Sequence, residues 1–321
     1  MPLGRTALQV TPFGLGSAAL GYMYEPVQRQ GALDTLRRAH ELGCGFFDTS
    51  PLYGSGLAEA RFGAVLPALP RASFTLSDKV GYAIYADSPL PDEGAPQPSP
   101  SPGKDYSYDG TLRMVEGSLK RLGLDRIDIL LIHDPDEQID EALAGTYRAL
   151  RRMRDEGVVG AIGAGMNHSH LLARLARAGD FDCFLLAGRY TLLDQTALAD
   201  LLPLAHERGI AIYIGGPFNS GILADPYAPS ATFNYARAPH ALVEKAQRLD
   251  AACRRHGVSL KAAAIQFPLG HPAVVSVLSG ARSVAELEEN VAAFREELPA
   301  ALWDDLRAEG LLAEGVPTPQ S

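Results

Sequence analysis

RIDILLIHDPDEQIDEALAGTYRALRRMRDEGVVGAIGAG, residues 126–165, contains the clearest strand–helix–strand pattern of the chain. The stretch begins with a short apolar run rich in Ile and Leu (126–133). It continues through an amphipathic segment (138–156) and ends in a second apolar run (158–165). Short apolar runs predict buried strands, and the longer periodic segment predicts a helix. This order is typical of two parallel strands that are joined by a crossover helix.

The same alternation runs along the whole chain and predicts eight strands and eight helices. An eightfold alternation favours a closed (β/α)8 TIM barrel, an α/β fold, over a doubly wound sheet. The 321 residues are more than the ~250 that such a barrel needs, so we expect one domain, 1–321, with added loops. The predicted strands are 11–16, 45–49, 73–80, 126–133, 158–165, 181–188, 210–216 and 274–280, and the predicted helices are 29–43, 54–67, 108–122, 138–156, 168–178, 195–208, 239–256 and 283–296.

The composition restricts the function classes. The net charge of −9, from 29 basic and 38 acidic residues, argues against a nucleic-acid or anionic-membrane surface. The three cysteines are widely spaced, which disfavours a disulfide framework or a structural zinc site and predicts a reducing cytoplasm. No apolar run approaches the ~18 residues of a membrane span, and the start lacks a signal-peptide core.

Two segments break the pattern. Residues 81–107 follow the third predicted strand and are rich in proline. Two interpretations stay open for this loop: a disordered surface insertion, or a lid on the substrate side of the barrel. The last residues, 315–321, are expected to fray.

Polar residues stand where neighbouring predicted strands end. Asp48 ends the second strand, Lys79 lies at the end of the third, and His133 ends the fourth, while Tyr53 follows Asp48 on the next turn. Taken singly, each has an ordinary explanation, such as a helix cap, a packing residue or a loop cap. Taken together, they converge at the C-terminal mouth of a barrel, where active sites of this fold lie.

These four residue types support acid–base chemistry. A buried Asp and Lys form an ion pair, and a cation beside a phenol favours the phenolate, which predicts a lowered pKa for Tyr53. A tyrosine tuned in this way can move a proton near neutral pH. His133 could orient the substrate oxygen or relay the proton.

Three segments resemble the signature segments of the aldo-keto reductases: GFFDTSPLYGSGLAEARFG (45–63), SLKRLGLDRIDILLIHDPD (118–136) and LSGARSVAELEENV (278–291). The N-terminal LGRTALQVTPFGLGSAALG (3–21) is similar to the family's opening β-hairpin and first strand. The resemblance implies a barrel and hydride transfer with a nicotinamide cofactor and no metal. It also implies a catalytic tetrad of Asp48, Tyr53, Lys79 and His133, with Tyr53 as general acid/base.

The resemblance further implies a cofactor that lies across the side of the mouth formed by strands five to eight. The start of the last helix can receive a phosphate through its free N–H groups. The cofactor-binding candidates are Gly16, Asn167, Tyr190, Pro217, Phe218, Asn219, Ser220, Gly221, Gly280, Arg282, Ser283, Glu286, Glu289 and Asn290.

Glu286 decides which nicotinamide cofactor we expect. It stands where members that prefer NADPH often have arginine, and a carboxylate there would repel a 2′-phosphate but accept a ribose hydroxyl. NAD is therefore expected, although NADP stays possible because Arg282 is close in the sequence. Glu286 can also be read as a capping-box glutamate three residues after Ser283.

Three further segments, 163–167, 181–195 and 215–223, look most like the aldose dehydrogenase branch that includes L-fucose dehydrogenase, or D-threo-aldose 1-dehydrogenase. That resemblance implies oxidation of a free sugar (L-fucose, L-galactose or D-arabinose type) to its lactone. The alternatives are a pyridoxal 4-dehydrogenase, a general carbonyl reductase or a nicotinamide-sensing regulatory subunit. The expected partner is a small sugar or carbonyl substrate, bound by a monomer or small homo-oligomer, and the substrate-binding candidates are Tyr22, Tyr24, Tyr85 and Arg189.

Overall fold

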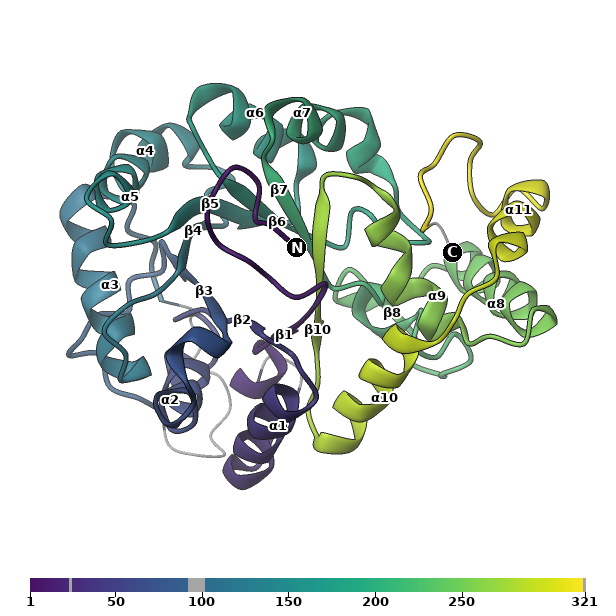
Figure 1. Ribbon diagram of the computed structural model, residues 1–321, viewed down its shortest axis with the longest axis horizontal. Helices are drawn as coiled ribbons and strands as arrows, with labels where there is room; N and C mark the ends of the chain where they lie inside the picture. Colours follow the sequence, from purple (N-terminus) through teal and green to yellow (C-terminus); the bar gives the residue numbers. More distant parts are fainter. Residues whose placement is uncertain (23–24, 92–101, 320–321) are drawn as a thin grey trace.

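The computed structural model describes residues 1–22, 25–91 and 102–319, and its centre is a closed barrel of eight parallel strands (Figure 1). Around the barrel the strands follow the order β1-β10-β7-β6-β5-β4-β3-β2, so the first and last barrel strands pair and close the sheet. The predicted TIM-barrel fold is thereby confirmed. The strands are β1 (Phe13–Gly16), β2 (Phe46–Asp48), β3 (Thr75–Val80), β4 (Ile129–His133), β5 (Ala161–Met166), β6 (Cys183–Ala187), β7 (Ala211–Gly215) and β10 (Val274–Gly280).

Helices surround the barrel and cover the outward-facing side chains of its strands. Because strand residues point alternately in and out, a small second cluster fills the barrel interior, with Phe46, Leu131 and Tyr213 among its buried members. The helices are α1 (Arg29–Glu41), α2 (Leu57–Gly63), α3 (Tyr108–Leu122), α4 (Ile139–Ala144), α5 (Thr146–Asp155), α6 (Ser169–Ala178), α7 (Leu201–Arg208), α8 (His240–Arg255), α9 (Leu260–Gln266), α10 (Val284–Arg295) and α11 (Ala300–Ala308).

The structure divides one predicted helix. The segment 138–156 forms α4 and α5, which meet at Gly145. A Cβ atom on Gly145 would lie 2.1 Å from the carbonyl oxygen of Tyr106, so this position requires glycine for close backbone contact. Helical periodicity continued across this point, and it therefore predicted a single helix.

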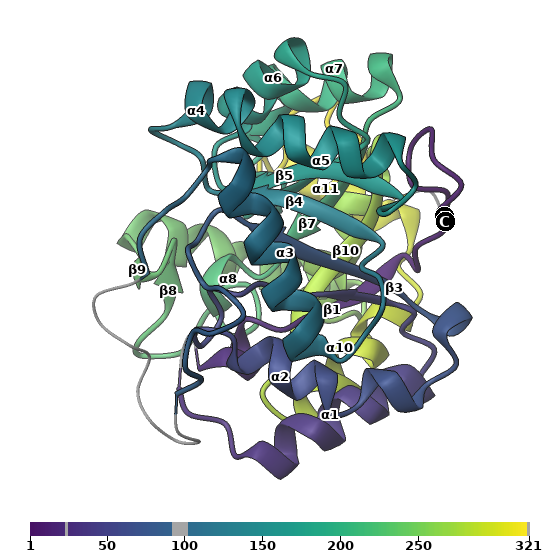
Figure 2. The same ribbon diagram turned by 90° about the vertical axis from the view of Figure 1, so that its left-hand side faces the viewer.

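The two ends of the barrel are built differently. At the end where the strands begin, the N-terminal segment folds back on itself through an antiparallel bridge between Pro2 and Gln9. At the opposite end, which is the C-terminal mouth, lies a hairpin of β8 (Thr232–Phe233) and β9 (Ala236–Arg237) that the strand pattern did not predict (Figure 2). This hairpin follows β7 in the chain and places its turn beside the mouth.

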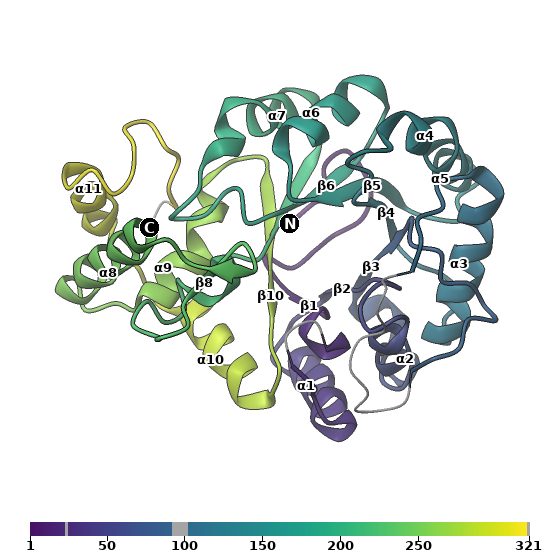
Figure 3. The ribbon, with the colours of Figure 1, turned by 180° about the vertical axis from the view of Figure 1, so that it is seen from behind.

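The C-terminal region packs on one side of the barrel. Helices α8, α9 and α11 gather beside β10, away from α3, α4 and α5 (Figure 3). The fraying of residues 315–321 stays a prediction, but residues 315–319 pack on the rest of the structure. Val316 is buried, and the Tyr190 hydroxyl donates to the Pro317 carbonyl over 3.1 Å. Residues 320–321 lie outside the described residues.

The long segment 81–107 also lies partly outside the described residues, since 92–101 are not among them. Its two described ends meet in an antiparallel bridge between Tyr82 and Lys104. The Tyr82 ring contacts the His133 ring, with centroids 5.2 Å apart, so this end of the segment lies at the barrel mouth. No helix in the described part of the chain is long and apolar enough to cross a membrane.

Candidate active site

The barrel brings the four strand-end residues together. Asp48 is the last residue of β2, Lys79 is the penultimate residue of β3, and His133 is the last residue of β4. These strands are consecutive neighbours in the sheet, so their C-terminal ends place the three side chains at one edge of the mouth. Tyr53 reaches the same place from the loop before α2.

A left-handed turn positions Tyr53. The three residues after it, Gly54, Ser55 and Gly56, all have positive φ, at 65°, 51° and 94°. Glycine adopts this backbone without strain, which explains two of the three residues in the sequence YGSG. Gly21 contributes from the other side, because a Cβ atom there would lie 2.6 Å from the carbonyl carbon of Tyr53.

A buried ion pair lies beneath the tyrosine. Lys79 Nζ lies 2.5 Å from Asp48 Oδ1 and donates to the carbonyl of Thr49 over 2.7 Å, and both charged side chains are at most 3% exposed. The same Nζ lies 4.8 Å from the centre of the Tyr53 ring. Asp48 and Thr49 therefore hold the ammonium group directly beside the phenol.

The electrostatics correct one expectation. Burial raises the pKa of Tyr53 above its usual range, and the charge of Lys79 offsets only part of this rise. The expectation of a lowered pKa is thus wrong, because it counted the cation and not the loss of solvent. Burial alone would lower the pKa of Lys79, but Asp48 and the other acidic groups around the ammonium group, Tyr53 and Asp78, together more than offset burial and raise this pKa, so the lysine stays charged.

His133 is held neutral beside the tyrosine. Burial, together with the charge of Lys79, lowers its pKa well below 6.5. Its Nδ1 lies 2.9 Å from the hydroxyl of Ser50, which already accepts a hydrogen bond from the Leu52 N–H. If that hydroxyl donates to Nδ1, the ring proton resides on Nε2, the nitrogen on the opposite side of the ring.

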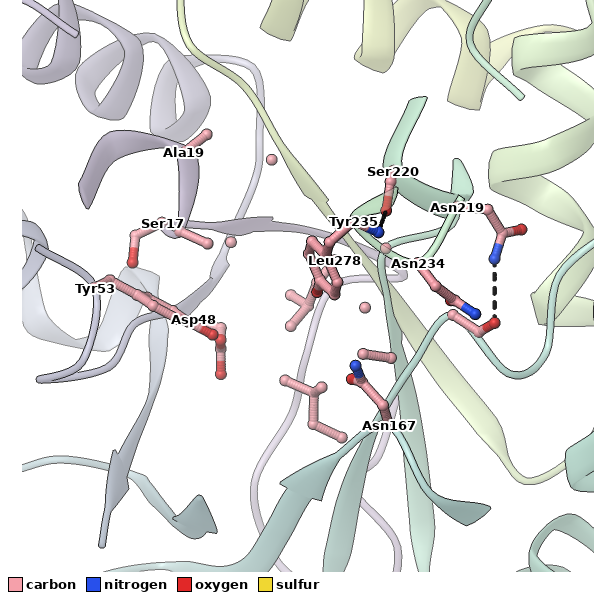
Figure 4. A pocket seen from close by; sticks show the side chains of 18 residues that line it. Ser17, Ala19, Asp48, Tyr53, Asn167, Asn219, Ser220, Asn234, Tyr235 and Leu278 are labelled. Carbon is pink, nitrogen blue, oxygen red and sulfur yellow. Dashed lines mark hydrogen bonds between the residues drawn. The ribbon is translucent and has the colours of Figure 1, made fainter. Parts of the chain in front are cut away.

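Three adjoining cavities form a trough across the mouth. The first, of 340 Å³, includes Tyr53, Lys79 and His133 in its lining. The second, of 150 Å³, shares Tyr53 and Asn167 with the first, and its lining side chains are drawn in Figure 4. The third, of 290 Å³, shares Ala19, Gly216, Ser220 and Gly280 with the second. The trough therefore runs from the Tyr53 end of the mouth to the start of α10.

Glycines expose backbone along the trough. In the second and third cavities, glycines occupy six lining positions, namely Gly16, Gly188, Gly215, Gly216, Gly221 and Gly280. A Cβ atom on Gly16 or Gly221 would meet nothing within 4 Å, so these positions leave room for a ligand against the main chain. An elongated groove of this kind fits a dinucleotide better than a compact ligand.

Charged residues surround the far end of the trough. Arg282 Nη2 lies 2.9 Å from Glu286 Oε1, and the guanidinium group also pairs with Glu25. Lys261 Nζ lies 3.1 Å from Glu289 Oε2. Both cations are therefore already paired, and three carboxylates face two positive groups. Arg282 more than offsets the effect of burial on Glu286 and lowers the pKa of that carboxyl, which keeps it ionised.

Comparison with known proteins decides the family, since residues 12–309 match the model of the aldo/keto reductase family. The chain belongs to this family. It is 39% identical to pyridoxal 4-dehydrogenase of Microbacterium luteolum, over 97% of each chain. It is 38% identical to D-threo-aldose 1-dehydrogenase of a Pseudomonas species, over 97% of this chain and 96% of that one. An aldo-keto reductase structure from Bacillus halodurans shares the fold, with a TM-score of 0.77, 24% identity and 98% and 97% coverage.

An aldo/keto reductase with such relatives is an NAD(P)-dependent oxidoreductase, and the residues of the trough fit a nicotinamide dinucleotide. Most cofactor-binding candidates line the trough. They are Gly16, Asn167, Pro217, Phe218, Asn219, Ser220, Gly221, Gly280, Arg282, Glu286 and Asn290. The Asn290 amide donates to Ser279 Oγ over 3.0 Å and to the Gly280 carbonyl over 3.1 Å, which fixes the wall of the third cavity.

Three cofactor candidates lie outside the cavity linings. Tyr190 is fully buried and packs on Phe267, with ring centroids 5.1 Å apart. Ser283 caps α10 by accepting from the Glu286 N–H, and Glu289 pairs with Lys261 at the surface. The predicted capping box is therefore only half formed. In a capping box the Glu286 carboxylate would accept from the N–H of Ser283, but here it accepts from the Arg282 N–H over 2.6 Å.

The substrate candidates Tyr22, Tyr85 and Arg189 likewise lie outside the linings. The Tyr22 hydroxyl accepts from Arg61 in the core, and the Tyr85 hydroxyl donates to Asp105. Arg189 donates to Asn234 Oδ1 over 2.8 Å and so supports the β8–β9 turn. Tyr24 lies outside the described residues.

The structure adds lining residues that the strand-end argument missed, namely Ser17, Asp134, Asn234, Tyr235 and Lys261. Asn234 and Tyr235 form the turn of the β8–β9 hairpin, both with positive φ. In Figure 4 they lie across the cavity from Tyr53 and Asp48. An Asn at a two-residue turn is a known hairpin signal, but the flanking strands are too short to show an alternating pattern.

His168 and His170 stand two residues apart after β5, and neither lines the three cavities. His168 Nδ1 lies 2.5 Å from Asp136 Oδ1, on the surface. Within residues 1–22, 25–91 and 102–319, no group of three or more His, Cys, Asp or Glu side chains is arranged to hold a metal ion.

Proposed function

We propose that this protein oxidises the anomeric hydroxyl of a free aldose to the lactone, with NAD as cofactor. The observation that carries the proposal is the placement of Tyr53 over the buried Lys79–Asp48 pair, at the end of a trough that suits a dinucleotide. The 38% identity to a D-threo-aldose 1-dehydrogenase supports the sugar as substrate.

The reaction removes a proton from the anomeric hydroxyl and a hydride from the anomeric carbon. A bound nicotinamide supplies the hydride acceptor. Tyr53 takes the proton on its phenolic oxygen, and the charge of Lys79 stabilises the phenolate that must form first. Neutral His133 donates from its ring nitrogen to the substrate oxygen and so orients it.

The choice of NAD follows from the charges at the far end of the trough. Arg282 is the group that would bind a 2′-phosphate, but Glu25 and Glu286 already pair with it. A further phosphate would meet an excess of carboxylates, whereas a ribose hydroxyl can donate to Glu286. We therefore assign NAD rather than NADP to this site.

A second candidate substrate is pyridoxal, favoured by the 39% identity to a pyridoxal 4-dehydrogenase. It would use the same proton and hydride transfer, because the carbon that is oxidised carries both a hydroxyl group and a hydrogen when pyridoxal is present as its cyclic hemiacetal. The two candidates differ in the groups around the reacting carbon: a sugar has several hydroxyls and pyridoxal has a flat aromatic ring.

The test is a spectrophotometric screen of NADH formation at mildly alkaline pH with L-fucose, L-galactose, D-arabinose and pyridoxal. We expect oxidation of at least one sugar, with a higher kcat/KM than for pyridoxal and a higher kcat/KM with NAD than with NADP. Preference for pyridoxal would favour the second candidate, and a clear preference for NADP would contradict the cofactor assignment. If Tyr53→Phe left function unchanged, the role would be regulatory rather than catalytic.

A further inference from the structure

We infer that the carboxylate of Asp134 binds hydroxyl groups of the substrate and makes the first cavity selective for polyols. This inference rests on the proposed function, since it concerns the same site, and it adds the residue that recognises the sugar. Asp134 lies outside the tetrad and was not among the candidates from the sequence.

The position of Asp134 is the first argument. It directly follows His133 at the end of β4 and lines the 340 Å³ cavity together with Tyr53, Lys79 and His133. A substrate whose reacting oxygen lies at Tyr53 and His133 therefore places its neighbouring groups within the same small cavity as this carboxylate.

The backbone of Asp134 is strained, and hydrogen bonds to its main chain fix its conformation. Its φ is 44°, which is uncommon for a residue other than glycine and is often found at functional sites. Its N–H donates to the Gly165 carbonyl over 3.0 Å, and its own carbonyl accepts from the Tyr106 hydroxyl over 2.9 Å and from Lys104 Nζ over 2.5 Å. The surrounding structure thus fixes the direction of this residue through its main chain alone.

The carboxylate itself keeps free acceptor capacity. Its Oδ2 atom lies 3.4 Å from the Tyr82 hydroxyl and 3.7 Å from His133 Nε2, and both contacts are long. The side chain of Asp134 is 34% exposed. In the described part of the chain, no lysine or arginine lies within ion-pair distance of it, because Lys104 is bonded to the backbone carbonyl instead. Two carboxylate oxygens offer about four acceptor sites, so most remain for a ligand.

The chemistry of these free acceptors identifies the ligand class. A carboxylate that accepts only hydrogen bonds recognises donors, and vicinal hydroxyls of a sugar present two donors at the spacing of two carboxylate oxygens. The rest of the cavity suits a sugar as well, since Asn167 adds an amide and Tyr235 an aromatic ring, while Leu185 and Ala187 are apolar. A site that is built to hydrogen-bond a substrate hydroxyl discriminates strongly against analogues that lack this donor.

The experiment compares Asp134→Asn with the wild-type holoenzyme on two lactols. One is the best sugar found in the screen, and the other is 2-hydroxytetrahydropyran, which has the reacting hydroxyl and no others. Asparagine tolerates positive φ as aspartate does, so the substitution removes the charge without adding backbone strain. Asp136→Asn is the matched control, because that carboxylate is two residues away, bonds His168 and does not line the cavity.

We expect Asp134→Asn to raise KM for the sugar at least tenfold with little change in kcat, and to change kcat/KM for 2-hydroxytetrahydropyran less than twofold. Asp136→Asn should match wild type on both. An equal loss on both lactols would overturn the inference in favour of a general structural or catalytic role, and no loss on either would overturn it outright. If the wild type oxidises no sugar, the proposed function fails. If the wild type oxidises sugars and Asp134→Asn does so equally well, only the present inference fails.

Discussion

Tyr53 controls the pH dependence of the proposed reaction. Its pKa is raised above the usual range by burial, so the phenol is protonated at neutral pH. Oxidation needs the phenolate, whose fraction grows about tenfold per pH unit below the pKa. At saturating sugar and NAD, we expect kcat to rise continuously from pH 7 to pH 10.

The pH profile of kcat also distinguishes the titration of Tyr53 from that of His133. The histidine pKa lies well below 6.5, so its charge does not change between pH 7 and pH 10 and adds no break to the profile. Tyr53→Phe should lower kcat at least ~100-fold, because general acid–base catalysis contributes about 10²–10⁴. A plateau that begins near neutral pH would contradict the raised tyrosine pKa.

Glu286 is the residue for which cofactor choice can be tested most directly. Replacing Glu286 with Gln keeps the shape of the side chain, removes one carboxylate and frees Arg282 from one of its two partners. We expect kcat/KM with NADP to rise by about tenfold. This change corresponds to about 1.4 kcal/mol, well below the ~4 kcal/mol of two charges ~4 Å apart near a protein surface, because both side chains are partly exposed. Steady-state kinetics with both cofactors measure this change.

Glu288→Gln is the control for that substitution. Glu288 lies on the same helix but pairs with Arg38 over 2.7 Å and does not line the trough. It should leave the NAD to NADP ratio unchanged. An unchanged ratio in Glu286→Gln as well would mean that Glu286 does not set the preference.

At the scale of elements, α2 and α3 are joined by a buried ion pair. Arg121 Nε on α3 lies 2.7 Å from Glu59 Oε2 on α2, with side chains 7% and 0% exposed. Arg121→Ala would leave the glutamate buried without its partner, which costs about 3–5 kcal/mol in comparable cases. We expect this loss in the free energy of unfolding measured by urea denaturation.

An exposed arginine provides the comparison. Arg126 lies 3.5 Å from Asp128 with 53% of its side chain exposed, so Arg126→Ala should cost at most about 1 kcal/mol. If the two variants lost equal stability, the pair between α2 and α3 would be no more important than a surface contact. Because α2 directly follows the Tyr53 turn, this pair also supports the segment that carries Tyr53.

For the molecule as a whole, the sequence predicted the barrel and the residues at the Tyr53 end of the trough. It did not predict the lining residues from irregular loops or the direction of the Tyr53 pKa shift. Buried strands and their polar ends leave a strong local pattern, which is why Asp48, Lys79 and His133 were placed correctly at strand ends. Asp134 and Tyr235 leave no such pattern in the sequence, because their positions depend on positive φ in irregular loops. The net pKa shift of Tyr53 also depends on burial, which is a property of the assembled barrel.

The C-terminal tail shows the same dependence on tertiary contacts. Composition predicted that it would fray, yet Val316 is buried, Pro317 accepts from Tyr190 and Thr318 accepts from Arg307 over 2.8 Å. These partners come from the loop after β6 and from α11, so the tail joins parts of the molecule that are distant in the chain. The packing is close, since a Cβ atom on Gly270 would lie 2.4 Å from the Thr318 carbonyl carbon.

Deleting residues 315–321 should therefore lower the free energy of unfolding by about 1.5–3 kcal/mol, the contribution of burying one valine side chain. Gly270→Ala should act in the same direction, because the added methyl group displaces the tail. Neither change should alter KM for NAD more than twofold, since none of residues 315–319 lines the trough. Unchanged stability of the truncated protein in urea would mean that the tail frays in solution, as its composition predicts, and that the fold is complete without it.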